Sequence, residues 1–233
     1  MKTVHLYNHP FRNLSLRQPW VLLPVAVIFL AIIWFANNWQ QLVIGILLLI
    51  AAFYAFKFLL RQSTVGYTLT ATHFQQHFAK GGWVVKWSNI HRIGICQFNN
   101  EGWYQPLPWI GIKLNDYRPY LDSICPRISS EIMLGQRALL YLGFKQRNQP
   151  SLFENAVLDS SPYHAANGQI YTGLQAMLAN RMRYQRAFYD YDVFISTSDL
   201  DRSGEEFVGL MRRYLAAVPA SERTKGRESD LLE

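Results

Sequence analysis

The feature that most constrains this chain is a long uncharged segment near its N-terminus. No Lys, Arg, Asp or Glu occurs between Arg17 and Lys57. The stretch 20–36 (WVLLPVAVIFLAIIWFA) lies within that segment, and the stretch 42–60 (LVIGILLLIAAFYAFKFLL) begins in it and includes Lys57 near its end. Each is close to the ~20 residues needed to cross a bilayer core. Helices in the core of a soluble protein keep a polar face, and neither stretch has one. The sequence therefore predicts a transmembrane helical hairpin over residues 20–60.

Positive charge predicts the orientation of this hairpin. Three basic residues precede the first span, the turn NNWQQ carries no charge, and Lys57 and Arg61 close the second span. Because Lys and Arg accumulate on the cytoplasmic side of membrane helices, the N-terminal segment 1–19 and the C-terminal domain are both expected in the cytoplasm. A cleavable signal peptide is the competing interpretation, but no small-residue cleavage site precedes the second span.

Charge is also unevenly distributed along the whole chain. Residues 1–100 contain eight basic residues and no acidic residue, whereas residues 101–233 contain the other 15 basic and all 16 acidic residues. Anionic lipid attracts a basic segment near a membrane by about 1 kcal/mol per Lys or Arg. Nucleic acid is the usual alternative partner for a basic protein, but the sequence has no dense Lys/Arg stripe and no nucleic-acid-binding motif. We therefore expect lipid contact and no nucleic-acid partner.

At Val65 the apolar residues change from helical spacing to alternation, which predicts β-strands. A Lys80-Gly81-Gly82 turn joins two of these strands into a hairpin. The two cysteines, Cys96 and Cys125, lack metal-ligand spacing. The pattern favours an antiparallel meander that curls on itself. The strand candidates cover residues 65–71, 73–79, 83–87, 90–98 and 107–115, with a loop at 99–106.

Helical spacing returns after this meander. Segment 129–144 has a serine cap, and Ser161-Pro162 opens a second predicted helix that continues to residue 188. Strand character then returns over residues 191–196 (YDVFIS). The pattern predicts two helices between the meander and a last strand.

The C-terminal region predicts one more helix. Ser203 and Glu206 form an S-x-x-E capping box. After the capping box, apolar residues recur on one helical face. Phe207 and Leu210 lie on this face and are expected to be buried. Residues 219–233 are polar and are expected to be disordered.

The segment from Tyr67 to Ile95 resembles the start of bacterial pleckstrin-homology-like (PH-like) domains. A Tyr-x-Leu-Thr strand (YTLTATHF), a hairpin with a Gly-containing turn and a W-x-x-I-x-x-I segment carry this resemblance; the last of these lies within VVKWSNIHRIGI. The strand YDVFIS and the helix RSGEEFVGLMRRYL resemble the end of such a domain. The whole chain resembles an uncharacterised proteobacterial family of two-span inner-membrane proteins.

The resemblance implies a membrane-anchored α+β fold located in the bacterial inner membrane. The transmembrane hairpin would be followed by a PH-like antiparallel β-barrel or sandwich, formed by residues 62–126 and 189–218 and closed by a C-terminal capping helix. Residues 127–188 have no counterpart in the simplest form of a PH-like domain. They are either a separate subdomain or a helical insertion. We favour the insertion because the last strand needs the barrel as its partner.

No pattern of residues predicts catalysis or metal binding. His73 and His77 lie two strand periods apart, with His91 as a candidate third ligand, but strand histidines on an outward face are commonly surface residues. The motifs DYD (190–192) and DLD (199–201) flank a strand end and a capped helix, where Asp commonly terminates structure. No phosphate loop, nucleophile elbow, C-x-x-C or H-E-x-x-H motif occurs. We expect no enzyme activity, cofactor or metal.

Basic residues are the remaining site candidates. One set is expected to meet lipid, either as a solvated positive face or as a headgroup pocket near the Lys80 turn. A second set is a candidate patch for a partner or for lipid. The first set comprises Arg61, Lys80, Lys86 and Arg92, and the second comprises Arg181, Arg183 and Arg186.

Three functions follow from these observations. The first is a non-enzymatic inner-membrane protein whose cytoplasmic domain serves as a membrane-proximal interaction or assembly module, with the bilayer and another membrane protein as partners. The second is a sensor of anionic lipid headgroups that uses the basic hairpin. The third, kept as a remote alternative, is a membrane enzyme of unknown chemistry.

Overall fold

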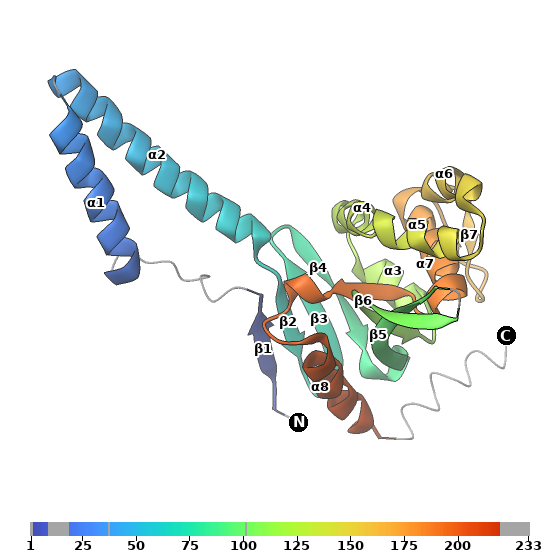
Figure 1. Ribbon diagram of the computed structural model, residues 1–233. Helices are drawn as coiled ribbons and strands as arrows, with labels where there is room; N and C mark the ends of the chain where they lie inside the picture. Colours follow the sequence, from blue (N-terminus) through green and yellow to red (C-terminus); the bar gives the residue numbers. More distant parts are fainter. Residues whose placement is uncertain (1, 9–18, 37, 101, 220–233) are drawn as a thin grey trace. The chain divides into compact units, whose positions relative to one another are not determined.

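A computed structural model describes residues 2–8, 19–36, 38–100 and 102–219 (Figure 1). The chain divides into two compact units. The helical unit is His9–Val65, and the sheet unit combines Met1–Asn8 with Gly66–Glu233. The tail that was predicted to be disordered lies outside the described residues, except for its first residue.

The helical unit contains two apolar helices that cover the two predicted spans, α1 (Pro19–Phe35) and α2 (Trp39–Ser63). No residue of α2 is buried, and within the described ranges α2 alone is long and apolar enough to cross a membrane. Helix α1 is shorter, at 17 residues. The two helices approach closely at Gly45, where an added Cβ would lie 2.7 Å from Cγ2 of Ile32. Glycine therefore permits this contact.

The sheet unit begins with a four-stranded antiparallel sheet in the order β1-β2-β3-β4. Strands β2 to β4 confirm the predicted hairpins, but β1 was not predicted. Strand β1 precedes the helical unit and β2 follows it, and Tyr7 pairs with Gly66 in the register. Both ends of the helical unit therefore connect to neighbouring strands of one sheet. The strands are β1 (Val4–Tyr7), β2 (Gly66–Leu69), β3 (His73–Phe78) and β4 (Gly81–Lys86).

A second antiparallel sheet has the order β5-β6-β9. Its first two strands form a long hairpin that includes most of the segment 99–106, which was predicted as a loop. Strand β9 pairs with β6 only from Trp109 to Ile112. The strands are β5 (Ile90–Asn100), β6 (Trp103–Leu114) and β9 (Val193–Ser196).

The two sheets do not form a closed barrel within the described part of the chain, so the predicted barrel is wrong there. A short 3-10 turn at Trp87–Asn89 separates β4 from β5. Trp87 is fully buried in this corner, where its indole N–H donates to the Thr70 carbonyl and its ring stacks on Tyr214. The structure is mixed α+β with two separate main sheets.

Residues 115–192, between β6 and β9, contain five helices and a small hairpin. The helix predicted over 129–144 is divided at Gln136, whose buried side chain donates to the Phe194 carbonyl and accepts from Gln185. The helix predicted from Ser161 starts only at Gly173, after the hairpin. The helices are α3 (Arg118–Ser123), α4 (Pro126–Gly135), α5 (Arg137–Gln146), α6 (Phe153–Val157) and α7 (Gly173–Tyr189), and the hairpin strands are β7 (Tyr163–His164) and β8 (Ile170–Tyr171).

The last helix, α8 (Gly204–Ala216), confirms the predicted capping box, because the Ser203 hydroxyl accepts from the Glu206 N–H at 3.3 Å. Its apolar face closes the core of the first sheet. Phe207 is fully buried, with its ring centroid 5.3 Å from that of Tyr67 and 6.3 Å from that of Phe74. Leu210, which was also predicted to be buried, is half-buried.

Candidate functional site

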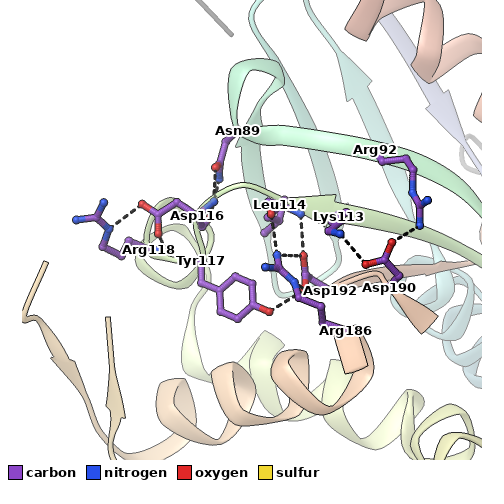
Figure 2. Close-up of polar contacts among 10 residues, drawn as sticks. All are labelled: Asn89, Arg92, Lys113, Leu114, Asp116, Tyr117, Arg118, Arg186, Asp190 and Asp192. Atoms are coloured by element: carbon purple, nitrogen blue, oxygen red, sulfur yellow. Dashed lines mark hydrogen bonds and ion pairs between the residues drawn. The ribbon is translucent and has the colours of Figure 1, made fainter. Parts of the chain in front are cut away.

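A buried carboxylate fastens the helical segment 115–192 to the second sheet (Figure 2). The Asp192 side chain is fully buried and accepts four hydrogen bonds. Arg186 donates two of them, from Nε at 2.6 Å and from Nη2 at 2.5 Å. The Tyr117 hydroxyl and the Leu114 N–H donate the others, each at 2.7 Å. Charge-assisted hydrogen bonds of this kind are the stronger ones in proteins, so the carboxylate is fully satisfied.

Arg186 joins the same elements a second time. Its Nη2 donates to the Leu114 carbonyl at 2.7 Å, and its guanidinium carbon lies 4.8 Å from the centroid of the Tyr117 ring. Although burial alone would lower it, the pKa of Arg186 is raised by the hydrogen bonds and the charge of Asp192. Burial and the charge of Asp192 raise the pKa of Tyr117. Arg186 therefore stays protonated and Tyr117 stays neutral near pH 7, which suits a structural network better than proton transfer.

Asp190, two residues earlier, forms a second and more exposed network. It caps α7 in the left-handed conformation with φ of 62°. Its carboxylate accepts from Arg92 Nη2 and from Lys113 Nζ, each at 2.6 Å. The hydrogen bond from Lys113 holds the pKa of Asp190 below its usual range, and the charges of Lys113 and Arg92 add to this. Both carboxylates of the DYD motif are thus engaged in ion pairs.

A hollow of about 370 Å³ lies beside the Asp192 network. The stacked rings of Tyr117 and Tyr163, together with Arg183 and Asp116, contribute to its wall. Asp116 is held by Arg118 Nε at 2.7 Å. A concave site with a few converging polar groups is the usual place for a small ligand. Arg183, Arg186 and Asp116 line the hollow, and Asp192 and Arg118 pair with two of these residues. Three arginines and two aspartates therefore surround it, which leaves an excess of one positive charge.

The histidines considered from the sequence lie on strands of both sheets. The Thr68 hydroxyl is hydrogen-bonded to His77 Nε2 at 2.9 Å and to His5 Nδ1 at 3.0 Å. His73 contacts Thr72, and His91 is exposed on β5. Among the described residues, no group of three His, Cys, Asp or Glu side chains lies close enough to hold a metal ion.

The four basic residues expected to face lipid are divided between the two units. Arg61 belongs to the helical unit. Lys80 forms an ion pair with Glu131 at 3.1 Å, and Arg92 pairs with Asp190. Lys86 lies opposite His73 in the register, at the other end of β4 from the Lys80 turn.

The second set of arginines lies on one helix, α7, but the three side chains differ in burial. Arg181 is only 3% exposed and donates to the Met133 carbonyl, near the C-terminus of α4. Burial lowers its pKa to about 10, and the charge of Arg137 contributes. Arg186 belongs to the Asp192 network, and Arg183 alone of the three is exposed. These three arginines therefore do not form one exposed patch.

Several partners in these networks were not recognised from the sequence. Tyr117 and Lys113 were not singled out, because no local spacing links residues 113–117 to residues 186–192. Their contacts arise only when the helical segment 115–192 returns the chain to β9. The alternation that predicted a strand ending near Leu114 was the one available signal.

Comparison with known proteins assigns a family but no activity. The chain belongs to the family described as "Protein of unknown function (DUF2982)", which matches residues 67–217. Comparisons with curated proteins and with solved structures found no match. The family match begins in β2 and ends just after α8, so it covers the sheet unit without β1 and excludes the helical unit.

Proposed function

We propose that this chain is a non-enzymatic, two-pass protein of the bacterial inner membrane whose sheet unit is a cytoplasmic, PH-like interaction or assembly module. The observation that carries the proposal is a strand pairing: β1, which precedes the helical unit in the sequence, pairs with β2, which follows it. Tyr7 and Gly66 are register partners, so the chain leaves the first sheet and returns to it at neighbouring positions.

This pairing constrains how the helical unit meets a bilayer. If α2 crosses the membrane, its first residue, Trp39, lies on the opposite side from β2. The chain between β1 and Trp39 must then cross as well, because β1 pairs with β2. Helix α1 is the apolar helix of that segment. An even number of crossings keeps the N-terminus and the sheet unit on one side, and the basic flanks make that side the cytoplasm.

The lengths of the helices are compatible with two crossings. At 1.5 Å per residue, the 25 residues of α2 extend about 37 Å and the 17 residues of α1 about 26 Å. The hydrocarbon core is about 30 Å thick, and a bilayer adapts to a mismatch of a few ångströms at a modest cost. Helix α2 is long enough to tilt, and α1 requires slight local thinning.

Strand order supports the PH-like part of the proposal. A four-stranded and a three-stranded antiparallel sheet are followed by a helix whose Phe207 enters the core. In this interpretation the helical unit is inserted between β1 and β2, and residues 115–192 are inserted between β6 and β9. Both insertions leave the order of the sheet strands intact.

An interaction role fits the site better than catalysis or headgroup sensing. Both carboxylates of the DYD motif are held in ion pairs, so neither is placed to act as a free general base. A headgroup pocket at the Lys80 turn receives less support, because Lys80 pairs with Glu131 and Lys86 lies at the other end of β4.

Topology reporters test the anchorage. Fusions at the N-terminus, near Asn38 and after Leu215 are expected to report inside, outside and inside. An inside signal near Asn38 would overturn the two-pass proposal.

Co-purification from native membranes tests the module. The full chain is expected to recover a partner membrane protein that a variant ending after α2 does not recover. Equal recovery by both chains would remove the assembly role from the sheet unit.

A further inference from the structure

The β5–β6 hairpin carries an exposed aromatic tip. From Trp103 to Pro108, β6 pairs only with β5 among the described strands, because the pairing of β9 with β6 stops at Trp109. At the tip, Trp103 is 80% exposed and Tyr104 is 68% exposed. Trp83 and Trp87 in the same unit are buried. Successive side chains of a strand point to opposite faces, so these two rings lie on the two faces of the hairpin tip. Large aromatic side chains exposed on both faces of a tip indicate a contact surface.

The chemistry of the tip favours side-chain contact over strand addition. Pro106 and Pro108 lie on the part of β6 that β9 leaves uncovered, and proline has no N–H to donate to an added strand. Glu101 is the only charged residue in the sequence from Gln97 to Trp109. A nearly uncharged tip with Trp and Tyr matches the chemistry of the water–lipid boundary, where these rings are favoured.

The tip lies at the end of the sheet unit from which the chain departs for the helical unit. A hollow of about 130 Å³ is lined by both Trp109 and Phe78. Phe78 pairs with Gly81, at the same end of the first sheet where Tyr7 pairs with Gly66. Trp109 therefore lies near the departure end, and β6 runs on from there toward Trp103, up to about 20 Å farther at 3.3 Å per residue.

The connection to α2 keeps this end close to the helix that would span the bilayer. Helix α2 ends at Ser63 and β2 begins at Gly66, so only Thr64 and Val65 intervene. A link of this length extends at most about 10 Å. Any membrane that holds α2 therefore lies within reach of the departure end.

We propose that the β5–β6 tip is a second membrane contact, in which Trp103 and Tyr104 insert into the interfacial region of the bilayer that holds the helical unit. The proposal rests on the two-pass anchorage proposed above. Insertion would give the sheet unit a fixed orientation on the membrane surface.

Site-specific quenching in proteoliposomes tests this proposal with the full chain. Three variants, Trp103→Cys, Leu158→Cys and Leu47→Cys, are made in a Cys125→Ser background, with Cys96 retained because it is buried. Leu158 is 71% exposed on the helical insertion and provides a matched control, and Leu47 lies in α2. Each cysteine receives an environment-sensitive fluorophore, which is quenched by aqueous iodide or by doxyl-labelled lipid.

The label at 103 is expected to show several-fold stronger lipid quenching and several-fold weaker iodide quenching than the label at 158. The label at 47 reports the anchorage separately, because it is quenched by lipid only if α2 spans the bilayer. Lipid quenching at 47, with 103 behaving like 158, would overturn the tip contact and leave the anchorage intact. Shielding of 103 from iodide without lipid quenching would also overturn it, in favour of a protein partner. Absence of lipid quenching at 47 would overturn the anchorage itself.

Discussion

The helical unit and the sheet unit use the same apolar residue types in opposite ways. In α2, Leu47 and Leu48 are 60% and 65% exposed and no residue is buried, whereas in the sheet unit Leu69 and Phe74 are fully buried. In water, apolar side chains gather away from solvent, but in a bilayer the solvent is itself apolar. The helical unit can therefore be recognised from its amino-acid composition alone, whereas the fold of the sheet unit depends on contacts between residues that are distant in the sequence.

The largest expected effect comes from removing the Phe207 ring, which packs α8 against the first sheet. Phe207→Ala should lower the free energy of unfolding of the sheet unit by about 3–5 kcal/mol, because the cavity lies between α8 and the first sheet. The helical content of α2 should persist, because α2 has no buried residue. Chemical denaturation in detergent, followed by near-UV circular dichroism, measures this loss.

Glu205→Gln, at an exposed first-turn position of the same helix, provides the control. It removes a charge worth about 0.3–1 kcal/mol at a helix N-terminus, so it should shift the unfolding midpoint far less than Phe207→Ala does. An unchanged midpoint for Phe207→Ala would mean that α8 does not close the core. Simultaneous loss of α2 helicity would mean that the two units do not fold independently.

A smaller effect is expected from the buried carboxylate, and the DYD motif supplies its own matched control. Asp192→Asn should cost near the lower end of about 3–5 kcal/mol, since it breaks a buried pair whose partner Arg186 is one-third exposed. Asp190→Asn breaks a half-exposed pair and should cost about 0–1 kcal/mol. Thermal unfolding of the two variants compares them directly. Equal losses would show that the insertion is not fastened through Asp192.

The smallest effect concerns the pH dependence of the first sheet. Burial lowers the pKa of His77, and the charge of His5 across Thr68 lowers it further. The unfolded chain, with a His pKa of about 6.5, then binds more protons than the folded one just below that pH, so stability should fall as the pH drops through this range. His77→Gln should reduce this acid-induced loss, measured by thermal unfolding between pH 7 and pH 5 (roughly the range in which His titrates). The control His91→Gln replaces an exposed histidine of β5 and should not reduce the acid-induced loss. If it reduced the loss equally, the loss would not come from His77.

The parts of the fold that could be predicted are those specified by patterns within short segments of the sequence. Alternation of apolar residues located β2 to β5, and the capping box located α8. Strand β1 could not be found in this way, because it is only four residues long and its partner in β2 lies beyond the whole helical unit. The division at Gln136 was missed for a similar reason, since its side chain is held by residues near 185 and 194.

The distribution of charge along the sequence also differs from its distribution in space. The first hundred residues contain no acidic residue, which suggested that their basic residues face lipid. In the folded chain, Lys80 pairs with Glu131 and Arg92 pairs with Asp190, both acidic partners from the later part of the sequence. Ion pairs between distant segments cannot be read from local composition. For the same reason, the Asp192 network was not predictable from either of its two segments.

The most direct measurement is a disulfide across β1 and β2 in intact membranes, because this pairing brackets the helical unit and requires an even number of crossings. His5 and Thr68 are register partners whose side chains touch, so the double variant His5→Cys, Thr68→Cys in a Cys125→Ser background should form a disulfide on mild oxidation. The control pair His5→Cys, Gln75→Cys lies two strands apart, at about 10 Å, and should not. Absence of the 5–68 disulfide, or equal formation of the 5–75 disulfide, would contradict the paired strands on which the two-pass arrangement depends.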